Sequence, residues 1–390
     1  MHLTVRCLHI LSSVERKDYF NYCPLFLGMT NLGKPNNSDR SEETPTGSRR
    51  QFLGKTGAAV GASTLTALSG CTSVLGGNSM DTLSIAFKPP FPFLQYHVMN
   101  QEGYFEELDP DIESTNFANK GLTIVSAYSD GDIDLAFMGI TPVIKMKSKD
   151  VPGKVTAANH KNGFVVFAHE DFAALWDEHG ADAFQMFREE KGRKFKFSTF
   201  PKGSVAFILL QYWLREELGI SPDLVDIEPM AGGSPVKRSL LSGNVDGTVI
   251  MEPIPTALEQ RDAPYERITW AGSFMSGQPG GVMFMHDRLW NDHPDIAKSV
   301  VAQHSRATET IQKQPTVAAE AVSKAKGDKL PTKIAQKALT SKASNYISDP
   351  AQITESTQLF VAQMESLGQI DSGVSNDAIF EQSLYDNIAE

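Results

Sequence analysis

Residues 129–142 read SDGDIDLAFMGITP: a polar turn with one glycine, the stretch Ile133–Met138, which is apolar apart from Asp134, and then Gly139. The apolar run has the length of a buried strand, and Leu122–Tyr128 before it predicts a helix. The pair Thr141-Pro142 is typical of a helix start, with a side-chain cap and a proline in the first turn. This succession of helix, strand and helix predicts an α/β fold.

A near copy of the pattern begins at residue 242, where the sequence reads SGNVDGTVIMEP. A helix is predicted over Ser234–Leu241 and a strand over Val245–Met251. Further strands are predicted ahead of the two copies, at 83–87, 112–117, 195–200 and 225–230. Two similar α/β units that face each other favour a cleft between them.

Six short motifs, in order and at characteristic spacing, carry a resemblance to a known family. They are Gly103-Tyr104-Phe105, Gly131-Asp132-Ile133-Asp134, Gly139-Ile140-Thr141-Pro142, Pro201-Lys202-Gly203-Ser204, Gly243-Asn244-Val245-Asp246 and Glu252-Pro253. From Leu83 to about Ile370 the chain resembles the solute-binding proteins of ABC transporters for nitrate, sulfonates, taurine and related compounds, including thiamine-precursor-like relatives.

The resemblance implies a two-lobed periplasmic-binding fold (type II, Venus-flytrap) that closes on a small solute and delivers it to a permease and its ATPase. We expect residues 82–168 and 263–390 to form the first lobe and residues 169–262 the second. The resemblance implies no catalytic residue, no cofactor and no metal, and we expect a monomer.

Predicted strand ends followed by helix starts at Thr141 and Ser204 direct free N–H groups and positive dipole ends toward the cleft, as an oxoanion site requires. Together with the family motifs they give one group of candidate ligand-binding residues: Gly139, Thr141, Lys202, Gly203, Ser204 and Glu252. The alternative is that Thr141 and Ser204 only cap their helices. Glu252-Pro253 resembles the family's turn into an interlobe crossing.

The segment Phe87–Phe93 follows the first predicted strand and offers one cation among several aromatic rings. Lys88 is a candidate partner for an anionic group, and Phe87, Phe91 and Tyr96 are candidates to stack on a flat or apolar tail. The alternative is that these rings belong to the core and that Lys88 is solvated. Asn119, beyond the second predicted strand, is a further candidate.

An export signal precedes the α/β region. Ser48-Arg49-Arg50-Gln51-Phe52-Leu53 resembles a twin-arginine signal, and Leu68-Ser69-Gly70-Cys71 resembles the lipobox of lipoproteins. We therefore expect residues 1–47 to be a disordered leader or the product of a mis-assigned start, with translation starting at Met29. Residues 48–70 are then the signal and residues 71–81 a tether.

Cys71 is the single cysteine left once residues 1–70 are removed, so the mature chain has no internal disulfide and Cys71 is the expected lipid attachment point. The same removal leaves 28 Lys+Arg and 42 Asp+Glu, a formal net charge of −14. Such a surface opposes nucleic-acid binding and suits a salt-rich setting, which favours a haloarchaeal source. We expect the protein on the extracellular face of the cytoplasmic membrane.

Two other classes of protein are weighed against the transport interpretation. An enzyme of the same fold is disfavoured for two reasons. A thiamine-pyrimidine synthase relative uses a cysteine-rich motif, whereas the mature chain keeps only Cys71. A menaquinone-pathway relative works in the cytoplasm, which the export signal opposes. No Gly-x-Ser-x-Gly elbow or His-Glu-x-x-His pair occurs. A structural surface protein would not explain the paired α/β units.

Overall fold

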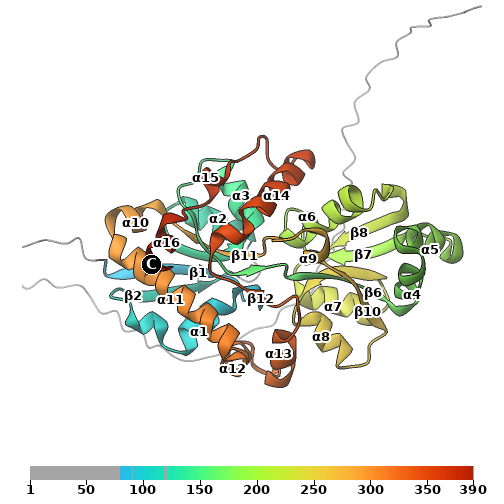
Figure 1. Ribbon diagram of the computed structural model, residues 1–390, viewed down its shortest axis with the longest axis horizontal. Helices are drawn as coiled ribbons and strands as arrows, with labels where there is room; N and C mark the ends of the chain where they lie inside the picture. The colour runs from blue at the N-terminus through green and yellow to red at the C-terminus, as the bar shows by residue number, and fades with distance from the viewer. Residues whose placement is uncertain (1–79, 90, 118–120, 390) are drawn as a thin grey trace, which may run out of the picture. The chain divides into compact units, whose positions relative to one another are not determined.

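The computed structural model describes residues 80–89, 91–117 and 121–389 (Figure 1). Arg49, Arg50, Cys71 and Asn119 lie outside the described residues, as do the leader, the signal and most of the expected tether.

The strands form two five-stranded sheets, in the orders β2-β1-β3-β11-β4 and β10-β6-β9-β7-β8, and β12 pairs with β5 (Figure 1). We call each large sheet with its covering helices the first and the second lobe. The strands are β1 Thr82–Phe87, β2 Asp111–Asn116, β3 Leu135–Gly139, β4 Lys154–Ala158, β5 His160–Lys161, β6 Phe164–His169, β7 Phe195–Thr199, β8 Val225–Pro229, β9 Gly247–Met251, β10 Tyr265–Trp270, β11 Gly281–Met285 and β12 Asn345–Tyr346.

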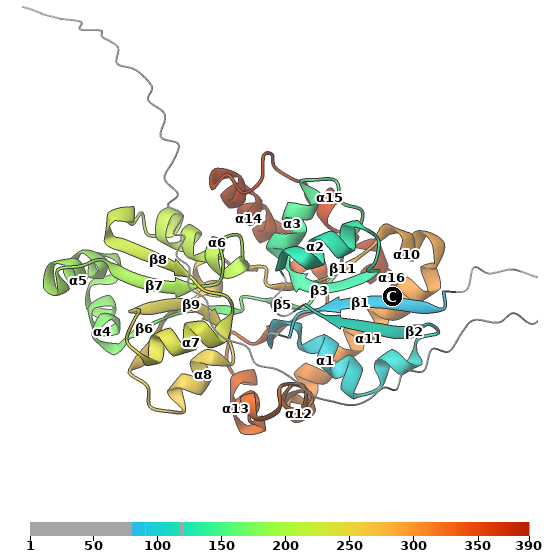
Figure 2. The same ribbon diagram turned by 180° about the vertical axis from the view of Figure 1, so that it is seen from behind.

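Helices cover both faces of each sheet, as the two opposite views show (Figures 1 and 2). They are α1 Leu94–Gln101, α2 Gly121–Ser129, α3 Ile140–Lys147, α4 Glu170–His179, α5 Ala183–Lys191, α6 Val205–Tyr212, α7 Gly233–Leu241, α8 Ile254–Glu259, α9 Ala271–Phe274, α10 Asp287–Asp292, α11 Pro294–Lys313, α12 Pro315–Lys326, α13 Thr332–Leu339, α14 Thr354–Ser366, α15 Asn376–Ile379 and α16 Ser383–Ala389. A π-helical turn at Trp213–Glu217 continues α6.

The internal repeat predicted from the sequence is a repeated topology. In the first lobe β1, α1, β2, α2 and β3 follow one another, and in the second lobe β7, α6, β8, α7 and β9 do the same. In both lobes the first strand is central and pairs in parallel with the second and the third. Parallel strands joined through helices bring the carboxyl ends of all three strands to one edge of the sheet, where ligands bind in open α/β folds.

An aspartate holds the equivalent strand junction in each lobe. Asp134 Oδ2 accepts a hydrogen bond from the Ser84 amide at 2.9 Å, and Asp246 Oδ2 accepts one from the Lys196 amide at 2.8 Å. Arginine side chains hold the same two carboxylates, Arg288 and Arg193 respectively, each at 2.6–2.8 Å. Both aspartates therefore have a structural role in fixing the strand register.

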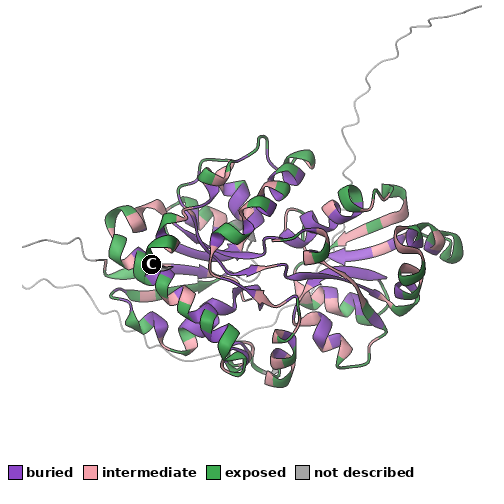
Figure 3. Ribbon diagram, viewed as in Figure 1, coloured by how far each residue is buried: buried purple, intermediate pink, exposed green. Residues whose placement is uncertain are grey.

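The central strands of each sheet are mostly buried, because helices cover both faces (Figure 3). In β3, Leu135 and Phe137 pack with α1, α11 and α12, whereas Ala136 and Met138 pack with α2 and α3. Successive side chains of a strand point to opposite faces, so strands in a sheet covered on both sides are apolar throughout. The near-continuous apolar runs seen in the sequence have this origin.

The strand pairing shifts both lobe boundaries expected from the sequence. β6 pairs with β9, and β10 pairs with β6, so residues 164–168 and 265–270 lie in the second sheet rather than in the first lobe. The chain changes sheet at 159–163 and again at 271–280, where Asn162 and Gln278 exchange hydrogen bonds of 2.8 Å. β6 and β10 are additions to the repeat that pair with each other in antiparallel, and the local sequence of neither strand indicates which sheet it joins.

Three histidines are buried in the first lobe and the crossing region, and they predict acid sensitivity. Burial lowers the pKa of His97 and His160 to about 4 and that of His304 to about 3. The unfolded pKa is about 6.5, so below that pH the unfolded chain binds protons that the folded chain does not. The stabilisation is complete above pH 6.5 and is lost as the pH falls toward the folded pKa values.

We expect the free energy of unfolding to fall between pH 6.5 and pH 5 by up to about 1.4 kcal/mol per pH unit for each histidine. Urea titrations at a series of pH values measure this slope. His304→Leu should reduce it by the contribution of one proton, while Thr308→Val, one helical turn away, should leave it unchanged. A stability that does not vary over this pH range would contradict the assignment.

Candidate functional site

A pocket of about 260 Å³ lies between residues of the two sheets. The first lobe contributes the carboxyl ends of β1 and β3, and the second lobe contributes those of β7 and β9, with the loop before α7. The lining residues are Lys88, Pro92, Phe93, Gly139, Thr141, Pro142, Phe164, Phe200, Pro201, Ser204, Val205, Ala206, Ala231, Gly232, Gly233, Met251, Gly280 and Gly281. This is the position at which the repeated topology predicts a ligand.

Lys88 is the charged residue among those that line the pocket. It directly follows β1, and its amide donates to the Phe137 carbonyl of the neighbouring strand at 3.3 Å. Burial lowers the pKa of the Lys88 ammonium. No carboxylate among the described residues forms an ion pair with it, so the pocket presents a partly desolvated cation that a bound anion would neutralise.

Three helices of eight or nine residues begin at the pocket: α3, α6 and α7. Ser204 caps α6 as expected, accepting a hydrogen bond from the Phe207 amide at 3.2 Å. The expected cap at Thr141 is wrong. α3 begins one residue earlier, at Ile140, with Gly139 as its N-cap and no side-chain cap. The Thr141 side chain lies inside the first turn instead, 1% exposed, and its hydroxyl has no partner in the described structure.

Gly139 and Val205 bring the two lobes into close contact beside the pocket. A Cβ atom added at Gly139 would lie 3.1 Å from Val205 Cγ2, a separation that forces the neighbour to shift. The Gly139 backbone has φ −73° and ψ 156°, which any residue can adopt. The glycine is therefore required for space and not for backbone conformation.

The aromatic residues proposed beside Lys88 do not line the pocket. Phe87 stacks on Tyr96 with ring centroids 3.9 Å apart, and Tyr96 is 5% exposed. Phe91 is buried against Tyr346, whose hydroxyl donates to the Phe91 carbonyl at 2.8 Å. All three rings belong to the core under α1 and α11, as in the alternative considered for them.

Three other candidates also lie away from the pocket lining. Lys202 is exposed in the turn before α6, and Gly203 occupies that turn with φ +83°. Glu252 is 2% exposed and its Oε1 accepts from Arg267 Nη2 at 2.7 Å. This carboxylate is part of the packing of the second lobe, and because β10 lies beyond it in the same sheet, Glu252-Pro253 is not at a crossing.

The sequence analysis did not predict several residues that line the pocket, above all Phe93, Phe164, Phe200 and Met251. Phe200 directly follows β7, and Met251 ends β9. The rule that ligands bind at the carboxyl ends of parallel strands would have selected both. Phe164 begins β6, an antiparallel strand, and no sequence signal places it there.

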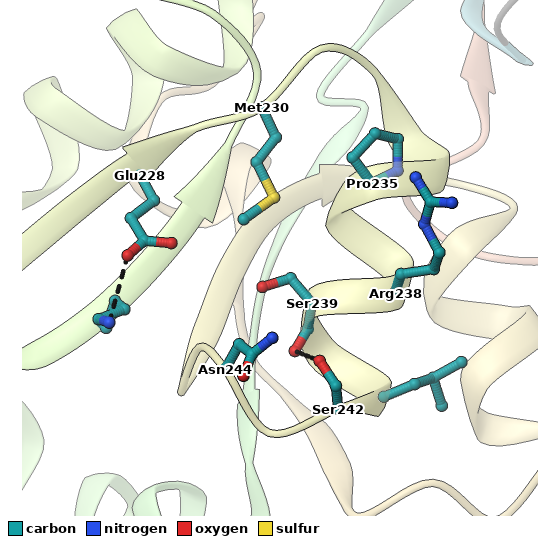
Figure 4. Close-up of a pocket in the computed structure, with 9 residues that line it drawn as sticks. Glu228, Met230, Pro235, Arg238, Ser239, Ser242 and Asn244 are labelled. Atoms are coloured by element: carbon teal, nitrogen blue, oxygen red, sulfur yellow. Dashed lines mark hydrogen bonds and ion pairs between the residues drawn. The ribbon is translucent and has the colours of Figure 1, made fainter.

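A larger hollow of about 760 Å³ lies on the second lobe alone, between β8 and α7 (Figure 4). Its charged groups already have partners or are open to solvent: Lys196 pairs with Glu228 at 3.2 Å, and both side chains are more than one third exposed. The Ser242 hydroxyl donates to the Ser239 carbonyl. The hollow lacks the partly desolvated, unpaired cation that distinguishes the pocket between the lobes.

Within the described part of the chain, no cluster of three or more His, Cys, Asp or Glu side chains is arranged to hold a metal ion. None of the described helices combines the length and the hydropathy that crossing a membrane requires.

The fold is that of periplasmic solute-binding proteins, as comparison with solved structures shows. The nitrate-binding protein NrtA from Synechocystis PCC 6803 is 14% identical, with 79% of this chain and 88% of that chain covered and a TM-score of 0.65. The aliphatic sulphonate binding protein SsuA from Escherichia coli is 16% identical, with 78% and 93% covered and a TM-score of 0.63. The SsuA protein from Xanthomonas axonopodis pv. citri, bound to MOPS, is 15% identical, with 77% and 98% covered and a TM-score of 0.60.

The NMT1-like family model matches residues 76–325, and the chain belongs to this family. No curated protein sequence matches the chain. The predicted two-lobed α/β fold is therefore confirmed, and the three solved structures that share it are binding proteins for nitrate or for sulfonates.

Proposed function

We propose that this protein is the solute-binding component of an ABC importer. It captures a small anionic solute, such as nitrate, a sulfonate or taurine, in the pocket between its lobes and delivers it to a permease driven by an ATPase. The observation that carries the proposal is the unpaired Lys88 ammonium in a pocket where three helices begin. Helix N-termini and a desolvated cation together favour a bound anion.

The sequence supports the location we propose for this function. The twin-arginine motif at Arg49-Arg50 and the lipobox cysteine Cys71 are consistent with a lipoprotein held on the extracellular face of the cytoplasmic membrane. A binding protein with one lipid-modified terminus acts there as a monomer that meets its permease by diffusion along the membrane. We propose no catalytic role for it.

A second candidate function is capture of an aromatic solute like a thiamine precursor. The aromatic side chains Phe93, Phe164 and Phe200 in the pocket lining favour it, because flat rings pack well on aromatic faces. The same measurement separates the two candidates.

Thermal unfolding in high salt, against nitrate, aliphatic sulfonates, taurine, bicarbonate and pyrimidines, tests the proposal. A ligand at about 100 times its dissociation constant should stabilise the protein by roughly 2.7 kcal/mol and raise the melting temperature visibly. We expect at least one anion to do so. Stabilisation by pyrimidines alone would favour the second candidate, and turnover of a compound that causes no shift would contradict the transport role.

A further inference from the structure

The pocket lining is asymmetric between the two lobes, and this asymmetry bears on the chemical class of the solute. The first lobe supplies the cation, Lys88, and the buried hydroxyl of Thr141 that lacks a partner in the described structure. These residues follow neighbouring strands, β1 and β3, which pair along 85–87 and 135–137. Among the described lining residues, a negatively charged group therefore has its one charged partner on the first lobe, while the starts of α6 and α7 on the second lobe add backbone amide donors.

The second lobe adds no charged side chain to the described lining: its side chains there are mainly apolar, and its polar groups are at the starts of α6 and α7. Phe200 and Met251 are half-buried, and the side chain of Phe164 is 2% exposed. Val205 and Ala206, at the start of α6, complete this wall, and Phe93 of the first lobe extends it. The one side-chain hydroxyl of the second lobe in the lining, that of Ser204, accepts from the Phe207 amide, which leaves its O–H as an uncharged donor toward the pocket.

The described lining residues include no aspartate or glutamate. A solute with an ammonium group would lose its hydration in this pocket and find no carboxylate to replace it. A bare inorganic oxoanion would neutralise the Lys88 ammonium, but it would leave the apolar wall of the pocket exposed to water. The 260 Å³ volume is several times the roughly 30 Å³ occupied by one water molecule, so the pocket has room for an organic group beside the anion.

We infer that the solute is an organic monoanion with an uncharged, apolar body of about the size of a benzene ring, its charged group on Lys88 and Thr141 and its body against Phe200, Met251 and Phe164. The inference rests on the proposed function and narrows it: nitrate and taurine are disfavoured in this chain, although both were open from the sequence.

Three matched pairs of probes test the inference by calorimetric titration of the soluble chain. Benzenesulfonate should bind at least about tenfold more tightly than methanesulfonate, because the two share a charged group and differ in the apolar body. Propane-1-sulfonate should exceed taurine by at least about tenfold, because the two differ by a methyl in place of an ammonium group. Benzoate should exceed benzamide, which lacks the charge.

Phe200→Ala should weaken benzenesulfonate binding by about tenfold and leave methanesulfonate binding nearly unchanged, because the shorter anion does not reach the apolar wall. Met251→Ala gives the same test should Phe200→Ala fold poorly. Leu359→Ala, at an exposed position on α14, is the control and should affect neither probe.

The outcomes separate this inference from the function on which it rests. Methanesulfonate or taurine binding as tightly as its more apolar counterpart would overturn the inference and leave anion capture standing. Tighter binding of benzamide than of benzoate would overturn the role of Lys88. Binding of none of the probes would count against both the inference and the proposed function.

Discussion

Arg267→Met is expected to lower the free energy of unfolding by about 3–5 kcal/mol, the cost of leaving a buried carboxylate without its partner. Arg267 Nη2 lies 2.7 Å from Glu252 Oε1, and the Glu252 side chain is 1% exposed. The same guanidinium binds Glu259 at 2.5 Å and donates to the Ser341 hydroxyl at 3.1 Å. The substitution therefore breaks the packing of the second lobe and its attachment to the segment that contains Ser341.

Urea unfolding monitored by circular dichroism measures the loss. Lys313→Met is the matched control, because Lys313 pairs with Glu309 on the exposed face of α11 and such surface pairs contribute less than about 1 kcal/mol. The double variant Arg267→Met with Glu252→Gln should recover part of the stability, since the buried group is then neutral. Equal effects of the Arg267 and Lys313 variants would show that the buried pair has no special role.

Lys88→Met is expected to weaken binding of a sulfonate or carboxylate by about 10- to 100-fold without loss of stability. A hydrogen bond to a charged group contributes about 1.5–3 kcal/mol, which corresponds to this range of affinity. The ammonium is partly buried and forms no ion pair with any described carboxylate, so its removal should not destabilise the fold.

Titration calorimetry with benzenesulfonate compares Lys88→Met with Lys145→Met. Lys145 is exposed on α3 of the same lobe and does not line the pocket, so its variant should bind like the wild type. Lys88→Arg should retain part of the affinity, because it keeps the charge with a different geometry. Unchanged affinity in Lys88→Met would place the anion elsewhere.

The repeated architecture could be predicted from the sequence because it depends on local signals. Strand runs such as Ile133–Met138 and the two turns that lead into Asp134 and Asp246 are set by apolar composition and by glycine, and the structure keeps them at equivalent places. The order of the six family motifs then predicted the two-lobed periplasmic-binding fold. Lobe membership could not be predicted in the same way, because the pairing of β6 and β10 depends on contacts distant in the sequence.

The candidate site was predicted in part. The pocket is lined by Lys88, Gly139, Thr141 and Ser204, because these residues lie at or just beyond the carboxyl ends of β1, β3 and β7, where ligands bind in open α/β folds. Phe87 ends β1, Phe91 lies in the turn after it and Tyr96 lies on α1, and all three rings pack into one core cluster, which a count of aromatic residues does not reveal. The apolar wall of the second lobe comes from strand ends far along the chain, and only the fold brings it opposite Lys88.

The central claim is that the pocket between the lobes captures an anionic solute. Equilibrium titration of benzenesulfonate and methanesulfonate into the wild type, Gly139→Val and Gly373→Val tests it most directly. A valine at Gly139 fills the space next to Val205, whereas Gly373 is exposed and a Cβ there would meet its neighbours at 3.6 Å or more. We predict one sulfonate per wild-type chain, the same for Gly373→Val, and at least about tenfold weaker binding for Gly139→Val. Equal binding by Gly139→Val and the wild type, or no binding of either sulfonate by the wild type, would contradict the claim.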